Sequence, residues 1–170
     1  MGKITNEPKL TGDSHLNDVR AAFEHRATWM YLLMDEARKK GLQWEDFART
    51  AITRCGVFDG QHKFLPVIKD PADLREFEQH FAADVSRDVF EMEILAADAD
   101  RYYLDFHYCP LVKAWQKQGC SEEEIAQLCD IAMAGDRGIA SQFPAYTFTL
   151  GQTIAKGDPV CQIRFDKKAK

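Results

Sequence analysis

The sequence predicts an α+β fold, with helices packed on one side of a roughly four-stranded antiparallel sheet. Three observations predict it. Apolar residues recur at helical spacing through the first half of the chain, alternation with period two begins near residue 90, and a second pair of alternating segments closes the chain. Helices followed by hairpin strands are typical of this class because an antiparallel sheet needs only short connections.

The first half of the chain is predicted to be helical. Residues 16–40 carry apolar side chains at every third or fourth position, and Gly41 ends the run. Residues 42–55 form a second helix, and Asp70 is predicted to cap a third helix that has Pro71 at its first position. The middle of the first helix is apolar around most of its circumference, so we expect other elements to cover it on both sides.

A β-hairpin is predicted to follow these helices. Apolar and acidic side chains alternate along its first strand, in the order Phe90, Glu91, Met92, Glu93 and Ile94. After a turn at residues 97–100, the second strand has Leu104 and Phe106 on one face and Asp105 and His107 on the other, because strand side chains alternate.

The register of this hairpin determines which polar groups meet. Keeping the apolar residues on one face pairs Phe90 with Phe106, and this register places Glu91 opposite Asp105. The second face then gathers Glu91, Glu93, Asp105 and His107, and we expect them to face a shared cavity beside Cys109. Two opposed carboxylates repel unless they are well solvated or one of them has a raised pKa, and the sequence leaves both alternatives open.

Cys109 lies where this strand is predicted to meet a helix. Pro110 suits the first helical turn, and Gly119 ends the helix. Free N–H groups at a helix N-terminus favour an anion, so we expect the pKa of the Cys109 thiol to be lowered and its nucleophilicity raised. The alternative is that Cys109 is a small filler near a cap on a solvated strand face.

The last third of the chain supplies a helix and two further strands. Ser121 and Glu124 form a capping box for a helix that runs to about Ala134 and is broken by residues 135–138. Strands are predicted at residues 146–150 and 161–165, with a turn at residues 156–159. Cys161 shares a face with Ile163 and Phe165, so packing in the core is its simplest interpretation.

Composition limits the function classes. The 170 residues suit one domain, which we place at residues 16–170 after a mobile N-terminal arm at residues 1–15. A formal charge of −5 argues against a nucleic-acid partner, and no apolar stretch is long enough for a membrane span. The absence of an apolar signal region points to the cytoplasm. The sequence leaves open whether the chain forms a homo-oligomer.

The five cysteines indicate reduced thiols. Their number is odd and none forms a C-x-x-C pair, which argues against a disulfide framework. The usual zinc-ligand spacing is absent as well, so we expect neither a metal nor another cofactor.

Several segments, taken in order, match a known pattern. They are His25-Arg26-Ala27, FHYCPLVKAW, EEEIAQLCDIAMAGD and TLGQTIAKGDPVCQIRF, between about Glu24 and Phe165. Together they resemble the L-2-amino-thiazoline-4-carboxylate hydrolase family. The resemblance implies a small-molecule substrate, a thiazoline that carries an amino group and a carboxylate, and hydrolytic opening of its cyclic amidine ring to N-carbamoyl-L-cysteine.

This chemistry assigns roles to the residues already selected. Ring opening requires a nucleophile, a base and a proton donor for the leaving thiolate. Cys109 could attack the amidine carbon, or water could attack directly while Cys109 shapes the pocket. His107 or one of the carboxylates Glu91, Glu93 and Asp105 could then transfer protons.

The predicted substrate-binding residues are His25, Arg26, Asp130, Arg137 and Cys161. A substrate carboxylate requires a guanidinium, for which Arg26 and Arg137 are the candidates. Asp130 could hold the substrate amino group or cap a neighbouring element, and His25 with Arg26 could be an ordinary pair on a helix surface. The competing function is a small-molecule-binding or sensor domain without catalysis, and a structural subunit is a third.

Overall fold

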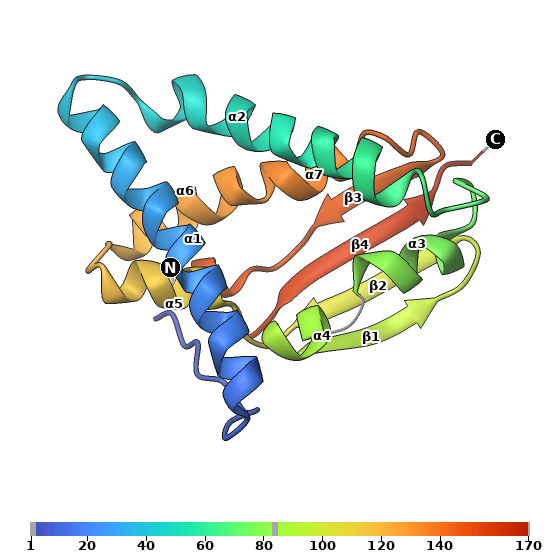
Figure 1. Cartoon of the computed structure of the whole chain (residues 1–170), viewed down its shortest axis with the longest axis horizontal. Helices are drawn as coiled ribbons and strands as arrows, with labels where there is room; N and C mark the ends of the chain where they lie inside the picture. The colour runs from blue at the N-terminus through green and yellow to red at the C-terminus, as the bar shows by residue number, and fades with distance from the viewer. Residues whose placement is uncertain (1–2, 83–84, 170) are drawn as a thin grey trace.

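The computed structural model describes residues 3–82 and 85–169 and confirms the α+β class. Its sheet has four strands in the order β1-β2-β4-β3, and every neighbouring pair is antiparallel. The strands are β1 (Met92–Ala97), β2 (Arg101–Phe106), β3 (Tyr146–Leu150) and β4 (Cys161–Lys167). Figure 1 shows the sheet with helices packed against it; α1 lies toward the opposite end of the molecule, and α2 runs along the top of the view beside α7.

The helices account for most of the remaining chain. They are α1 (Ser14–Lys39), α2 (Trp44–Asp59), α3 (Leu74–Phe81), α4 (Val85–Val89), α5 (Pro110–Lys117), α6 (Glu122–Ala132) and α7 (Ala134–Ala140). A π-helical turn, η1 (Gly60–Phe64), extends α2, and a short 3-10 turn, η2 (Ile154–Lys156), precedes β4. Within residues 3–82 and 85–169, none of the helices combines the length and the apolar character that a membrane crossing requires.

The two faces of the sheet differ in polarity. On the face toward the helices, Tyr102, Leu104 and Ile163 are fully buried. On the other face, Arg164 donates to Asp105 across 2.6 Å. The alternation of side chains along β2 and β4 therefore separates an apolar interior from a polar outer surface.

The buried apolar residues form two clusters. The first joins α1, α5 and α6 and includes Trp115 and Leu128; the second joins α3 to the sheet and includes Phe77 and Phe165. Phe106 and Met133 pack against both clusters. The space between the clusters is where the cavity described below is found.

Helices α2 and α7 approach each other closely along a line of glycines. A Cβ atom added to Gly56 would lie 1.9 Å from the carbonyl oxygen of Gly135, and one added to Gly138 would lie 2.4 Å from that of Thr53. Only hydrogen fits between these backbones, so both positions require glycine. The contact fixes α7 against α2.

Local sequence signals placed several helix ends correctly. Pro110 is at the first turn of α5 with Cys109 as its N-cap, and Ser121 and Glu124 form the predicted capping box of α6. The first helix begins two residues earlier than predicted, because the Asp13 side chain accepts from the N–H of Leu16.

Other local predictions were wrong. Asp73, not Asp70, is the N-cap of α3, and the Asp70 side chain accepts from Ala72 in the preceding turn. Residues 135–138 do not break the helical region but lie within α7, which follows α6 almost directly. The glycines there serve the contact with α2, which single-sequence propensity does not reveal.

The hairpin register also differs from the prediction. Met92, not Phe90, pairs with Phe106, and Glu93, not Glu91, lies opposite Asp105. The register shifts again between Ile94 and Ala96 at a bulge. A slip of two residues keeps every side chain on its face, so the apolar pattern alone could not distinguish the two registers.

Residues 3–10, within the segment predicted as a mobile arm, lie against the body of the protein. Ile4 and Asn6 are buried, and Glu7 pairs with Lys113 of α5 at 2.9 Å. The segment therefore passes over the junction between β2 and α5.

Candidate functional site

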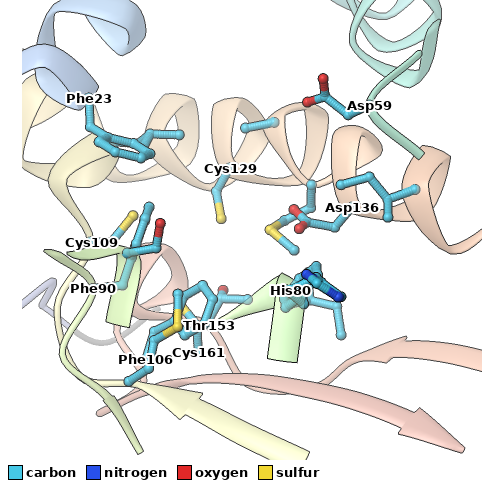
Figure 2. A pocket seen from close by; sticks show the side chains of 18 of the residues that line it. Phe23, Asp59, His80, Phe90, Phe106, Cys109, Cys129, Asp136, Thr153 and Cys161 are labelled. Carbon is cyan, nitrogen blue, oxygen red and sulfur yellow. The ribbon is translucent and has the colours of Figure 1, made fainter. Parts of the chain in front are cut away.

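A cavity of about 370 Å³ lies between the two apolar clusters. All seven α-helices, the turn η1 and all four strands of the described chain contribute residues to its walls. Figure 2 shows the labelled side chains that converge on it. The lining is mostly apolar, with Phe23, Phe81, Phe90, Met92, Phe106, Leu111, Trp115, Met133 and Ile139 among its residues. An apolar cavity with a few convergent polar groups is the usual form of a small-molecule site.

Three thiols line this cavity. Cys109 comes from the junction of β2 and α5, Cys129 from α6 and Cys161 from β4 (Figure 2). All three are buried, and burial raises the pKa of each thiol. The site therefore holds neutral thiols near neutral pH, and a thiolate must be generated by proton transfer to a base.

Cys109 has the predicted position but not the predicted acidity. The nearby N–H groups of Val112 and Leu111 and the charge of Arg26 act to lower the pKa of its thiol. Loss of solvent around the thiol has the larger effect and raises the pKa, so the expectation of a lowered value was wrong. The helix N-terminus offsets the effect of burial only in part.

Two acidic residues line the cavity, Asp59 and Asp136. Asp136 lies in the first turn of α7, and burial raises the pKa of its carboxyl to about 6, although Arg26 and Arg137 act in the opposite direction. His80 of α3 also lines the cavity, while Lys63 pairs with Asp59 across 2.7 Å at the same wall. A carboxyl with a pKa near neutrality can both accept and return a proton.

Asp136→Asn is expected to stabilise the protein at about pH 7. The carboxyl pKa is about 6 in the folded chain and about 3.9 in an unfolded one, so folding takes up a proton and stability falls as the pH rises through this window. Asparagine cannot ionise, and the free energy of unfolding should rise by about 1–2 kcal/mol at about pH 7 and not at about pH 4. Urea unfolding at both pH values measures this; an equal change at both would contradict it.

The predicted acid–base residues of the hairpin do not line this cavity. Glu93 and His107 bond to each other at 2.9 Å, and Asp105 is paired with Arg164. Glu91 accepts from Arg20 at 3.0 Å and from the N-terminal segment. The expectation that these groups share a cavity with Cys109 was therefore wrong.

The prediction failed because β2 ends earlier than expected. The strand stops at Phe106, so the alternation of faces does not continue to Cys109. Cys109 consequently turns toward the cavity together with Phe106, which belongs to the apolar face.

The predicted binding residues are divided between several places. Cys161 lines the cavity. Arg26 lies with its guanidinium 4.7 Å from the ring centre of Phe23 and lines a smaller adjoining pocket that shares Asp136 with the cavity.

The other three predicted binding residues have structural partners. Asp130 accepts from Arg137 at 2.7 Å and from Arg49 at 2.7 Å, which links α6, α7 and α2. His25 is exposed and packs against Trp29. None of these three lines the cavity.

Several cavity residues were not selected from the sequence, namely His80, Cys129, Asp136 and Thr153. A signal existed for three of them. Cys129 and Asp136 fall in the segment EEEIAQLCDIAMAGD, and Thr153 in TLGQTIAKGDPVCQIRF. For His80, a polar residue on an amphipathic helix, the sequence holds no comparable signal.

A family model described as L-2-amino-thiazoline-4-carboxylic acid hydrolase matches residues 20–165. No curated protein matches the chain. Across residues 3–82 and 85–169, no three His, Cys, Asp or Glu side chains are grouped so as to hold a metal ion.

Proposed function

The chain belongs to the L-2-amino-thiazoline-4-carboxylic acid hydrolase family, and we propose that its cavity hydrolyses a small cyclic amidine that carries a carboxylate. The observation that supports this most directly is the convergence of a half-buried carboxyl, Asp136, and the buried Cys109 thiol on one mostly apolar cavity. Its volume of about 370 Å³ lies at the lower end of the range of about 300–1,000 Å³ for ligand sites, which suits a single substituted ring.

The proposed reaction adds water across the amidine carbon. In L-2-amino-thiazoline-4-carboxylate this carbon lies between two nitrogens and the ring sulfur. Water supplies the oxygen, the C–S bond breaks, and the ring sulfur leaves as a thiolate that takes up a proton. The product is N-carbamoyl-L-cysteine, and one water molecule is consumed.

We propose two routes for the attack. In the covalent route, the Cys109 sulfur adds to the amidine carbon, the ring C–S bond breaks, and water then cleaves the bond to Cys109, which restores the thiol. In the direct route, water adds first and Cys109 only shapes the cavity. The thiol must lose its proton in the covalent route, and Asp136 or the basic ring nitrogen of the substrate can accept it.

Asp136 suits the amidine for a further reason. A carboxylate binds the planar N–C–N group of an amidinium through two parallel hydrogen bonds, as it binds a guanidinium. Binding a cation would lower the pKa of Asp136 and favour its charged form. Substrate binding would thus hold this carboxyl in its charged form.

Arg26 is proposed as the anchor for the substrate carboxylate. Arg26→Met is expected to raise KM about tenfold, because a partly desolvated charge-assisted bond is lost, while kcat should stay within about threefold of the unmodified protein. Steady-state kinetics measure both constants. Arg137→Met is the matched control, since that guanidinium bonds to Asp130, and its KM should stay within about twofold. An unchanged KM for Arg26→Met with a raised KM for Lys63→Met would assign the anchor to Lys63.

The function itself is tested by incubating the purified protein with L-2-amino-thiazoline-4-carboxylate. Mass spectrometry should detect N-carbamoyl-L-cysteine, and a thiol reagent should detect the new free thiol after the protein is removed. Calorimetry with the same compound distinguishes the alternatives. Saturable binding without product would support the binding-domain function, and neither binding nor product would reject both.

A further inference from the structure

The N-terminal segment, residues 3–10, is fastened at several points around the β2–α5 junction. The N–H of Ile4 donates to Glu122 of α6, and the Ile4 side chain is buried in the first apolar cluster. Farther along, the N–H groups of Lys9 and Leu10 donate to one carboxylate oxygen of Glu91 at 2.7 and 2.8 Å. The hydrogen bonds of Ile4 and of Lys9 and Leu10 thus hold the segment on either side of Asn6.

Asn6 bonds to the main chain of Cys109 in both directions. Its side-chain N–H donates to the Cys109 carbonyl oxygen at 2.8 Å, and its side-chain oxygen accepts from the Cys109 N–H at 2.9 Å. The carbonyl oxygen also accepts from Lys113 in the first turn of α5. Asn6 is 3% exposed, so these bonds are shielded from water.

This pairing fixes the residue that carries the thiol. Cys109 is the N-cap of α5, so its own N–H is not part of the helix ladder and depends on a partner outside it. A residue held at both its N–H and its carbonyl oxygen cannot rotate about its backbone without breaking one of the bonds. The direction of the Cys109 Cα–Cβ bond, from which Sγ reaches the cavity, is therefore set by a side chain more than 100 residues away in sequence.

We propose that Asn6 is a positioning residue for Cys109. The inference rests on the proposed role of Cys109. The family match begins at residue 20, so it does not include Asn6. A displaced nucleophile slows the chemical step more than it weakens binding, because the reacting atoms must approach within a narrow geometry.

Asn6→Ala is expected to lower kcat about 10- to 100-fold while KM changes less than about threefold. Alkylation of Cys109 by iodoacetamide, followed by peptide mass spectrometry, is expected to become at least about fivefold faster, because a loosened junction exposes the thiol and lowers its pKa. Both rates are measured well below the unfolding midpoint of the variant, where the protein is folded. Under these conditions, lower turnover together with faster alkylation cannot be explained by a loss of folded protein.

Ile4→Ala is the matched control. It removes a buried side chain from the same segment but leaves the bonds to Cys109 in place. Its kcat and its rate of Cys109 alkylation should remain within about threefold of the unmodified protein. If Asn6→Ala does not fold, Asn6→Asp replaces it, since aspartate has the same shape and keeps the acceptor for the Cys109 N–H.

Two results would overturn the proposal: unchanged kcat and alkylation in the Asn6 variants, or an equal loss of kcat in Ile4→Ala. If the unmodified protein does not hydrolyse the thiazoline at all, the proposed function fails, but the alkylation rates still decide whether Asn6 positions Cys109.

Discussion

Cys109→Ser is expected to lower kcat by at least about 1,000-fold while the protein remains folded. A hydroxyl is a far weaker nucleophile than a thiol, so the covalent route would be lost. Serine is nearly the same size and is a favourable residue at the N-cap of α5, where Cys109 lies, so the melting temperature should change little. Rapid quenching of the unmodified enzyme with mass measurement should show an adduct on Cys109.

Cys120→Ser is the control for this variant. Cys120 is a partly buried free thiol that does not line the cavity, so its replacement should leave kcat within about twofold. If Cys109→Ser keeps its activity within about tenfold and no adduct forms, water attacks directly. That outcome would remove the covalent route and leave the hydrolase proposal intact.

Gly56→Ala should be the most destabilising single-methyl change in the contact between α2 and α7. The new Cβ would lie 1.9 Å from the carbonyl oxygen of Gly135, and backbone cannot move aside as a flexible side chain can. We expect the free energy of unfolding to fall by about 3 kcal/mol or more, at the upper end for overpacked sites. Denaturant titration followed by circular dichroism measures the change.

Gly135→Ala tests whether this loss is steric. A Cβ at Gly135 would have its nearest neighbour, the Ile52 Cγ2 atom, at 3.6 Å, which is ordinary contact. Alanine also favours a helix over glycine by up to about 1 kcal/mol, so this variant should be neutral or slightly stabilised. Equal destabilisation of the two variants would show that helix contact is not the cause. Because α7 carries Asp136, Gly56→Ala should also reduce turnover.

The fold class could be predicted because side-chain periodicity reports which face of each element is buried. Periodicity placed α1, the hairpin and the final strands correctly, and Ser121 marked the start of α6. It could not fix the hairpin register, because a slip of two residues leaves the alternation of apolar and polar side chains unchanged. Nor could it identify the glycines of α7 as contact residues, because their role depends on α2, which is distant in sequence.

The site was predicted less completely than the fold. Cys109 and Cys161 could be selected from the sequence because the Cys-Pro junction and the final motif are local signals. Both residues line the cavity. The acid–base group was sought along the same strand as Cys109, but the cavity instead receives Asp136 from α7. Such a group comes near the thiol only through tertiary packing, which the order of residues along one strand does not encode.

The two apolar clusters bear on how the molecule unfolds. Within residues 3–82 and 85–169, the partly buried residues that pack against both clusters are Phe106 and Met133, and both of these line the cavity. Each cluster can therefore act as a cooperative unit that opens on its own, with slow amide hydrogen exchange inside each and faster exchange at the seam. A ligand in the cavity contacts both clusters, so its binding should stabilise both against local opening and slow amide hydrogen exchange in both.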